Sequence, residues 1–573
     1  MKKNPLLLFL VLFWLFAHSF YPYTASVGSF SEQVQKFIRN RIETASFPAQ
    51  LKAGEEVLFA SVALPRFYEQ RVYRPAWVDD TGPLSRAEAL VRAIHGARNE
   101  GLHPEDYHLR KMESLFRQWS DLRKTENLQK ARVLADLELL LTDAFLIYGS
   151  HLVSGKVNPE NIDSEWIASR REVDTAQLLE KAIQSNEIAE TLTSLLPEHA
   201  GYGRLKTALS RYREIETGGG WPVVPEDSKL QKGDRNDRVT ALRVRLLVTG
   251  DLESDNKIES DVFDDELEGA VRRFQKRHGL DSDGVVGPKS LDALNASPSE
   301  RVKQIESNLE RWRWLPQDLG ARHILLNIAN YMLDIMEDGV QVLTMRAIIG
   351  KEYRKTPVFS ASMIYLVLSP FWHIPPKIAI QDKLPLIKKD VTYLEKQKIR
   401  VFQRWGAEAR EIDPRTVDWE NVTAKNFEYR LRQDPGPLNA LGQVKFMFPN
   451  KFNVYIHDTP SRELFVRDER AFSSGCVRVE KPIDLAVYLL RENPKWKREN
   501  ILAAIDTGLE QTVALPNPIL VHLLYWTAWV DEDGTVQFRK DIYARDQKLW
   551  ESLNEESPKL FETQKRGAAC DWE

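Results

Sequence analysis

The sequence predicts an α+β multidomain protein with three parts: a helical N-terminal region, a small helical bundle, and a mainly β C-terminal domain that carries a helical insert. Three observations lead to this fold class. At about 100–200 residues per domain, 573 residues are enough for several structural units. Apolar residues follow a helical three-to-four spacing before about residue 215 and form β-branched runs after about residue 322. A Gly-Gly-Gly-Trp-Pro segment at residues 218–222 is typical of a linker.

The composition excludes several classes of protein. The 79 Lys and Arg residues nearly balance the 83 Asp and Glu residues, and the formal net charge of −4 makes an extended nucleic-acid surface unexpected. The chain has two cysteines, Cys476 and Cys570, too few for a disulfide-rich scaffold, a Cys-rich zinc module or an iron–sulfur protein. The histidines are dispersed and lack paired ligand spacing, so the sequence predicts no metal and no cofactor.

Residues 1–25 are expected to form a signal peptide or an N-terminal anchor. Lys2 and Lys3 precede an unbroken apolar run at residues 6–17, which is the order of charged and apolar regions in a secretory signal. The run is shorter than the ~20 residues that cross a bilayer comfortably as a helix. Cleavage of the signal and its retention as a membrane anchor both remain open, and in either case the rest of the chain is expected to be exported.

Two helical units are expected after this segment, at residues 30–215 and 225–297. The first has helical periodicity interrupted by prolines and is interpreted as a helical scaffold. The second carries two apolar helical stripes followed by a turn. The stripes consist of Val239, Leu242, Leu246, Leu267, Val271 and Phe274. A bundle that does nothing but pack is the alternative for this unit.

The strand-rich domain is expected to cover residues 300–545, with a polar tail at 546–573. Runs such as 323–328 and 444–448 are rich in aliphatic and β-branched side chains. A charged, helix-like insert occupies residues 378–438. Insertions of that size inside a sheet domain are commonly lids or binding elements, so this one is expected to be a lid or a binding element.

One segment of the strand-rich domain combines residue types suited to nucleophilic catalysis. His457 ends a strand-like run, and the alternation of a strand places Tyr455 and His457 on the same face. Downstream, residues 473–478 run Ser-Ser-Gly-Cys-Val-Arg. A cysteine thiol has a pKa of ~8.5 and needs an adjacent base or cation to form the thiolate. His457 is the candidate base for Cys476.

The neighbours of Cys476 suggest further roles. Ser474 and Gly475 are small enough for a backbone to pass close to a substrate, and the amides of Gly475 and Cys476 can line an oxyanion hole. Arg478 lies on the same side as Cys476 if the chain is extended, where it can stabilise a thiolate or meet a substrate carboxylate. Two alternatives remain for Cys476: buried packing, and a disulfide with Cys570.

The segments at 457–460 and 473–478 resemble the active-site signature of the L,D-transpeptidases. The wider chain is similar to the large, exported, multidomain members from Gram-negative bacteria. The segments that carry this similarity are 73–77, 100–102, 308–316, 350–351, 356–357, 372–376, 442–446, 527–529 and 541–543. Residues 225–297 resemble the peptidoglycan-binding helical domain of wall enzymes. Many relatives have His where this chain has Ser474, which leaves His457 as the single candidate base.

The resemblance implies a periplasmic peptidoglycan L,D-transpeptidase that forms 3→3 cross-links. The nucleophilic cysteine would attack the carbonyl at the L-centre of meso-diaminopimelate in a tetrapeptide stem, releasing D-alanine and leaving a thioester. The side-chain amine of diaminopimelate on a second stem would then resolve the thioester. A carbapenem would be expected to acylate the same cysteine, and residues 225–297 would bind the wall polymer. The insert at 378–438 would cap the active site.

Seven residues receive roles under this resemblance. The roles are catalysis by Cys476 and His457, oxyanion binding or positioning by Ser474, Gly475 and Arg478, and substrate binding by Tyr455 and Trp372. Three rival functions remain: an enzyme of the same fold that attaches or releases a wall-linked lipoprotein, a non-catalytic peptidoglycan-binding scaffold, and a papain-like protease. The protease is disfavoured because its histidine would lie far downstream of a helix-borne cysteine.

Overall fold

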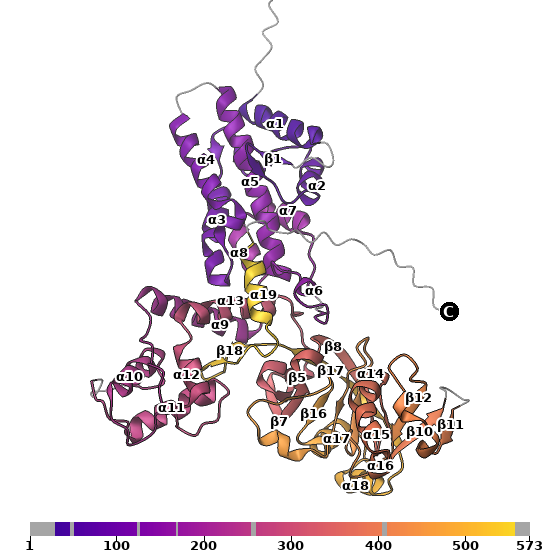
Figure 1. Ribbon diagram of the computed structural model, residues 1–573. Coiled ribbons are helices and arrows are strands. Elements are labelled where there is room, and N and C mark those ends of the chain that lie inside the picture. The colour runs from indigo at the N-terminus through magenta and orange to yellow at the C-terminus, as the bar shows by residue number, and fades with distance from the viewer. Residues whose placement is uncertain are drawn as a thin grey trace, which may run out of the picture.

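The computed structural model describes residues 29–45, 51–122, 127–167, 170–253, 259–403 and 409–555. The expected signal or anchor and Cys570 lie outside the described residues. Within the described part, no helix is both long enough and apolar enough to cross a membrane. The predicted α+β multidomain class is confirmed, with helical units in the first half and a strand-rich domain in the second (Figure 1).

The scaffold region is a group of helices around one long central helix. Its helices are α1 (Phe30–Thr44), α2 (Ala63–Gln70), α3 (Ser85–His95), α4 (Leu109–Asp121), α5 (Asn127–Ser154), α6 (Pro159–Ile162), α7 (Thr175–Ser185), α8 (Ile188–Thr193) and α9 (Ala200–Thr217). Helix α5 is buried along most of its length and contacts α1, α2, α3, α4 and α7. Its buried Glu138 accepts hydrogen bonds from the Tyr68 hydroxyl (3.0 Å) and the Trp77 amide (2.8 Å), which fastens the chain near residues 68–77 to the central helix.

A separate small bundle follows the glycine-rich linker. It consists of α10 (Asp237–Thr249), α11 (Asp265–Arg277) and α12 (Pro288–Asn295). The six apolar residues of the two predicted stripes are all buried in its core, which confirms the helical periodicity read from the sequence. Helix α13 (Pro298–Arg313) then leads to the strand-rich domain and contacts α9 of the scaffold.

The C-terminal domain is built on a nine-stranded sheet with the order β15-β7-β16-β14-β13-β8-β17-β5-β6, counted over the described residues. Strands β6 and β7 also pair, so the sheet closes on itself. The strands are β5 (Arg322–Asn327), β6 (Met332–Glu337), β7 (Val340–Gly350), β8 (Phe359–Leu368), β13 (Val444–Met447), β14 (Ile456–His457), β15 (Ala471–Ser473), β16 (Val477–Val479) and β17 (Gln511–Leu524). Helices α17 (Pro482–Leu490) and α18 (Arg498–Asp506) contact this sheet.

The insert between β8 and β13 is only partly helical. Short helices α14 (Pro376–Ile378), α15 (Leu384–Lys389) and α16 (Thr392–Lys396) lie between the first and second strands of a sheet whose described strands have the order β11-β10-β12-β9. These strands are β9 (Trp372–His373), β10 (Ile399–Gln403), β11 (Arg410–Ile412) and β12 (Tyr429–Gln433). The expectation of a helix-like insert was therefore wrong for its second half: charged and apolar residues alternate at 399–401 and 429–432, which is the pattern of a half-buried strand, and the high overall charge of the insert drew attention away from it.

The C-terminal end of the described chain is the second departure from expectation. Residues 545–553 were assigned mostly to a polar tail, but they form helix α19 (Arg545–Leu553), which contacts α13 (Figure 1). Leu549 and Leu553, one turn apart, are buried against the strand-rich domain. Two apolar residues at helical spacing were enough to dock a segment whose average composition is polar.

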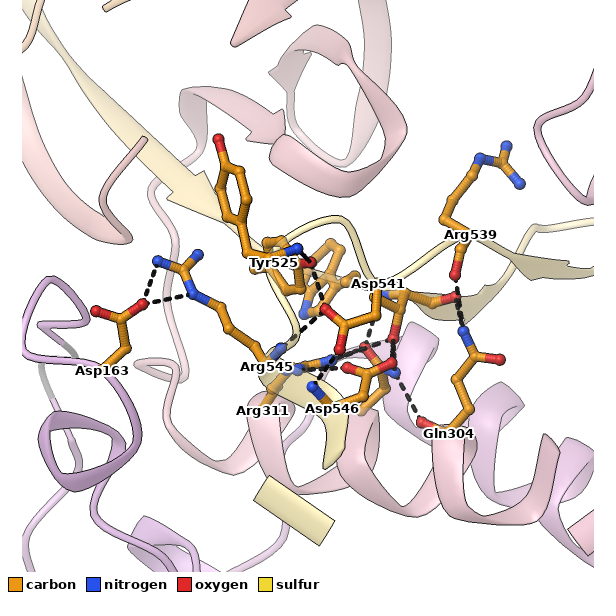
Figure 2. Close-up of polar contacts among 12 residues, drawn as sticks. Asp163, Gln304, Arg311, Tyr525, Arg539, Asp541, Arg545 and Asp546 are labelled. Atoms are coloured by element: carbon orange, nitrogen blue, oxygen red, sulfur yellow. Dashed lines mark hydrogen bonds and ion pairs between the residues drawn. The ribbon is translucent and has the colours of Figure 1, made fainter. Parts of the chain in front are cut away.

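Polar contacts fasten α19 and the chain before it to the rest of the molecule (Figure 2). Arg545 pairs with Asp163, which follows α6 of the scaffold, at 2.8 Å. Arg311 of α13 pairs with Asp546 at 2.6 Å. The Asp541 carboxylate accepts hydrogen bonds from the Tyr525 hydroxyl (2.5 Å) and from the amide of Arg545 (3.0 Å). The scaffold, α13 and the end of the strand-rich domain therefore meet in one ion-paired junction.

Candidate active site

Three adjacent strands bring the predicted histidine and arginine together. Strand β14 pairs in parallel with β16, with His457 opposite Arg478, and antiparallel with β13, with Lys445 opposite His457. The amide of Val477 donates to the carbonyl of Tyr455 at 3.1 Å, which continues the β14–β16 pairing up to the residue beside Cys476. This register sets Lys445, His457 and Arg478 in a row across the sheet.

The loop between β15 and β16 holds Cys476 through its own backbone and side chains. The Ser473 hydroxyl donates to the Cys476 carbonyl at 2.5 Å and accepts the Gly475 amide at 3.1 Å. The Thr356 hydroxyl donates to the Gly475 carbonyl at 2.9 Å. The Gly475 amide, expected as an oxyanion donor, is thus already bonded inside the loop in this conformation, whereas the Cys476 amide stays a predicted donor.

Gly475 is required for the shape of this loop. Its φ of +111° lies in the region that other residues rarely adopt, and a Cβ there would lie 3.3 Å from the carbonyl oxygen of Lys355. A side chain at 475 would therefore strain the backbone and push the loop away from the neighbouring segment. Cys476 would move with it.

Cys476 is a free, half-buried cysteine. Burial raises the pKa of its thiol, while the backbone and hydroxyl of Tyr455 and the positive charges of Lys445 and Arg478 act in the opposite direction on that pKa. The thiol therefore rests in the neutral form, among groups that can stabilise a thiolate when one forms.

His457 is buried and also rests in the neutral form. Burial first, and then the nearby Arg478, lowers the pKa of His457 to about 3. Its Nδ1 lies 2.5 Å from the carbonyl oxygen of Asp458. A carbonyl can only accept a hydrogen bond, so Nδ1 carries the proton of the neutral ring, and the backbone of Leu441 is a second hydrogen-bonding neighbour of the imidazole. That tautomer is the one a general base needs.

Asp458 holds the end of the strand that carries His457 in place. This buried carboxylate accepts the Gln443 amide at 2.8 Å and pairs with Arg462 at 3.1 Å. A Cβ at Gly442, whose φ is +62°, would collide with the same carboxylate. The segment at 442–446, noted for its family resemblance, thus packs directly against the turn after His457.

Tyr455 and Trp372 lie where the insert meets the sheet. Trp372 belongs to the hydrophobic core of the insert, and Tyr455 packs against that core. Burial, and next the charge of Cys476, raises the pKa of Tyr455, which keeps its hydroxyl protonated and able to donate to the sulfur. Trp372 is almost fully buried, so in this conformation it supports the wall of the site more than it lines it.

Three residues near the site were not found from the sequence: Lys445, Arg354 and Tyr543. Lys445 Nζ lies 4.0 Å from the centre of the Tyr455 ring. Arg354 donates to the hydroxyl of the exposed Ser474 at 2.8 Å.

Arg354 also links the loop to the insert. It pairs with Asp382 through two contacts of 2.6 and 2.8 Å. Asp382 lies in the helical part of the insert, between α14 and α15. The residue two positions before Cys476 is therefore connected, through Arg354, to the element expected to cap the site.

Tyr543 acts from the C-terminal junction. Its hydroxyl donates to the Gly350 carbonyl at 2.6 Å and accepts the Thr356 amide at 3.1 Å. Thr356 is the residue that holds the Gly475 carbonyl. Lys445 and Tyr543 lie in the segments 442–446 and 541–543 noted for their family resemblance, and Arg354 lies between the segments 350–351 and 356–357, but the contacts these residues make are not visible in a linear sequence.

Among the described residues, no group of three or more His, Cys, Asp and Glu side chains is arranged to hold a metal ion. The groups around Cys476 are cationic or neutral donors. What the arrangement offers is a thiol with nearby donors, a neutral imidazole of defined tautomer and an arginine facing the sulfur. Such groups suit nucleophilic acyl transfer.

Comparison with known proteins points to one family. Family models match residues 62–209 as "Scaffold domain", residues 235–294 as "Putative peptidoglycan binding domain" and residues 321–498 as "L,D-transpeptidase catalytic domain". A curated protein of Haemophilus influenzae named "Putative L,D-transpeptidase" is 36% identical over 253 residues, which are 44% of this chain and 50% of that protein. The chain thus spans half the length of this relative.

Solved structures give the same family name. An L,D-transpeptidase from Xylanimonas cellulosilytica is 16% identical and aligns over 52% of this chain and 99% of its own, with a TM-score of 0.17. Another, from Stackebrandtia nassauensis, is 12% identical over 53% and 96%, with a TM-score of 0.21. TM-scores this low carry no weight for the fold, so the family rests on the matched domains and the curated relative. The chain therefore carries an L,D-transpeptidase catalytic domain together with a scaffold domain and a peptidoglycan-binding domain, and it is similar to a curated protein named as a putative L,D-transpeptidase.

Proposed function

We propose that this protein is an exported peptidoglycan L,D-transpeptidase that forms 3→3 cross-links with Cys476 as its nucleophile. The observation that carries the proposal is the position of Cys476 beside the Tyr455 hydroxyl, Lys445 and Arg478, next to the strand that bears His457. The matched catalytic domain covers all of these residues.

In the proposed acylation step, the Cys476 sulfur attacks the carbonyl at the L-centre of diaminopimelate in a tetrapeptide stem. The thiol proton passes to Nε2 of His457 as the carbon–sulfur bond forms. The carbon–nitrogen bond then breaks, and the proton is returned to the amine of D-alanine as it leaves. Because the thiol and the imidazole both rest neutral, this transfer is expected to occur only as the substrate approaches.

The neighbouring groups fit this step. Tyr455 can donate to the sulfur, and Lys445 and Arg478 can stabilise the thiolate or hold a carboxylate of the stem. The Cys476 amide is the remaining predicted oxyanion donor, and Ser474 shapes the approach through its bond to Arg354. The ε-amine of diaminopimelate on a second stem then attacks the thioester, which releases the thiol and forms the cross-link.

Intact-mass measurement tests the nucleophile. The full chain is incubated with a carbapenem, and separately with a disaccharide-tetrapeptide while released D-alanine is measured. We expect one covalent adduct that Cys476→Ala abolishes and the matched control Cys570→Ala retains. No adduct on the folded protein, or an adduct that survives in Cys476→Ala, would refute the proposed nucleophile.

The acceptor is tested in the same assay. A second tetrapeptide and a lysine-bearing lipoprotein peptide compete for the acyl-enzyme, and the products are separated by mass. The proposal predicts the 3→3 linked dimer. Transfer to the lipoprotein peptide alone would instead favour the alternative that attaches or releases a wall-linked lipoprotein, and acylation of neither would favour a non-catalytic scaffold.

A further inference from the structure

One face of the insert's four-stranded sheet is basic. The register sets Arg432 of β12 between Arg400 of β10 and His373 of β9, and sets Arg430 opposite Phe402. Side chains alternate along a strand, so these residues share one face. The opposite face carries Ile399, Val401 and Leu431, which are buried in the core of the insert.

Two of the arginines lie on aromatic rings. The guanidinium of Arg430 is 4.7 Å from the centre of the Phe402 ring, and that of Arg432 is 4.8 Å from the same ring and 4.3 Å from the ring of Phe371. Phe402 is only 7% exposed although it lies on the outer face, because the two guanidinium groups cover it. The rings hold both arginines in place before any ligand arrives.

These two arginines are only weakly paired. In the part of the chain that the structure describes, the one acid paired with either is Asp434, 3.6 Å from the Nη2 atom of Arg432. Both side chains are partly exposed; their Nε atoms are buried, so a ligand would meet the terminal nitrogens. Arg400, on the same face, is by contrast satisfied by Asp434 at 2.6 Å and by Glu411 at 3.2 Å.

The basic face continues toward the nucleophile. Burial first, and then the charge of Arg430, lowers the pKa of His373, with smaller effects of Arg432 and Lys445 in the same direction and of Glu510 in the opposite one. Lys445 in turn interacts electrostatically with Cys476 and with Glu510. Lys445, whose Nζ lies 4.0 Å from the centre of the Tyr455 ring, therefore interacts with both Cys476 and His373 and connects the basic face with the nucleophile. The Glu510 carboxylate, which accepts the Phe371 amide at 2.7 Å, is an acid that acts on both Lys445 and His373.

We propose that Arg430, Arg432 and His373 form the binding surface for the carboxylates of the donor stem peptide whose reacting carbonyl lies at Cys476. The inference rests on the proposed function and adds where the rest of the donor is held. A stem peptide carries several free carboxylates, and a guanidinium with unused N–H groups binds a carboxylate through charge-assisted hydrogen bonds. The charge complementarity and the continuity with the site select this ligand.

Steady-state kinetics with a disaccharide-tetrapeptide tests the surface on the full chain. Arg430→Gln and Arg432→Gln are each expected to raise KM about tenfold, with kcat changed less than twofold, because each removes a charge-assisted bond made equally in the ground and transition states. Arg415→Gln is the matched control: this insert arginine is exposed and already paired with Asp413. Raising the salt concentration should increase KM of the wild type more than that of the variants.

The outcomes separate this inference from the proposed function. If the variants keep the wild-type KM and salt dependence, the basic face does not hold the donor, even where the wild type releases D-alanine. If the wild type forms no adduct with a carbapenem, the proposed nucleophile itself fails. If a variant loses both kcat and the ability to be acylated by a carbapenem, the substitution has damaged the fold of the site, which circular dichroism would also detect. The variants Arg430→Lys and Arg432→Lys then decide. Recovery of the wild-type KM by the lysine variants supports the surface, and no recovery refutes it.

Discussion

The strand-rich domain contacts the other parts of the chain at two junctions, and the charged residues of these junctions differ in how exposed they are to solvent. Toward the scaffold, Arg311 and Arg545 are 1% exposed and pair with Asp546 and Asp163 at 2.6 and 2.8 Å (Figure 2). Toward the peptidoglycan-binding domain, a cavity of about 1090 Å³ opens beside a few direct contacts, among them the bond that the Arg539 guanidinium donates to the Arg277 carbonyl at 2.9 Å. Lys289 is 60% exposed there and reaches Glu469 at 3.6 Å.

The difference indicates how each junction is held. Buried ion pairs cannot be broken one partner at a time without leaving a charge in a dry environment, so the scaffold junction is expected to be rigid. Exposed pairs are weak and screened by salt, so the other junction is expected to adjust with little cost. The rigid junction also reaches the nucleophile loop, through Tyr543 and Thr356.

The largest effect is expected from Arg311→Met. This substitution should lower the free energy of unfolding by about 3 kcal/mol, because it leaves the largely enclosed Asp546 carboxylate, 18% exposed, without its cation. Burial already raises the pKa of Asp546, and Arg311 opposes that rise, so in the variant Asp546 should take up a proton more readily. The deficit should therefore shrink as the pH falls. Denaturant unfolding of the full chain, followed by tryptophan fluorescence at several pH values, measures both effects.

Lys289→Met is the control for that experiment. It removes a cation from the open junction and should change the free energy of unfolding by less than about 0.5 kcal/mol. Equal losses for the two substitutions would mean that the two junctions do not differ in rigidity.

Tyr543→Phe tests whether the rigid junction positions the nucleophile. Removing the hydroxyl leaves the Gly350 carbonyl and the Thr356 amide without this partner, at a cost of about 1–3 kcal/mol. We expect the rate of carbapenem acylation to fall about tenfold, with the pH dependence of the reaction also altered because Cys476 shifts. Tyr488→Phe, which removes a half-buried hydroxyl that donates to Glu337, should leave the rate unchanged. A loss of stability with no change in the acylation rate would limit Tyr543 to a structural role.

A smaller effect is expected from Arg478→Gln on the titration of the nucleophile. Burial holds the pKa of the Cys476 thiol above its usual range, and Arg478 partly counteracts this. Without that positive charge the pKa should rise further, so the midpoint of alkylation by iodoacetamide should move to higher pH. Arg498→Gln, a surface substitution at a residue paired with Asp484, is the control. A midpoint that moves to lower pH in Arg478→Gln would contradict the electrostatics of the site.

A small effect is also expected from the charge reversal Lys289→Glu. The new carboxylate faces Asp468 and Glu469 across the open junction, and exposed like charges of this kind destabilise by less than about 1 kcal/mol. Hydrogen exchange near residues 467–470 should become faster, and added salt should restore it. Exchange that stays unchanged at low salt would mean that these exposed pairs do not hold the junction.

The sequence alone was sufficient for the parts of this protein that depend on local patterns. Helical spacing predicted the core of the α10–α12 bundle, and strand alternation predicted that Tyr455 and His457 share a face next to the cysteine loop. The roles of Cys476 and His457 also came from the sequence and stay predictions. The insert was predicted less well: Arg400, Arg430 and Arg432 alternate with buried residues as in a half-buried strand, but the strands are short and the high charge of the whole segment outweighed that pattern.

Tertiary structure decided which distant residues meet at the site. Lys445 lies beside His457 through the register of β13 with β14. Arg354, just after the end of β7, donates to Ser474, and Tyr543 contacts Thr356 from the C-terminal junction. Each of these contacts is set by strand pairing or domain packing between segments far apart in the chain. Local periodicity cannot indicate such a contact. The sequence by itself therefore indicated most of the helices and strands and the loop that carries Cys476, and only the tertiary structure decided which residues surround the sulfur.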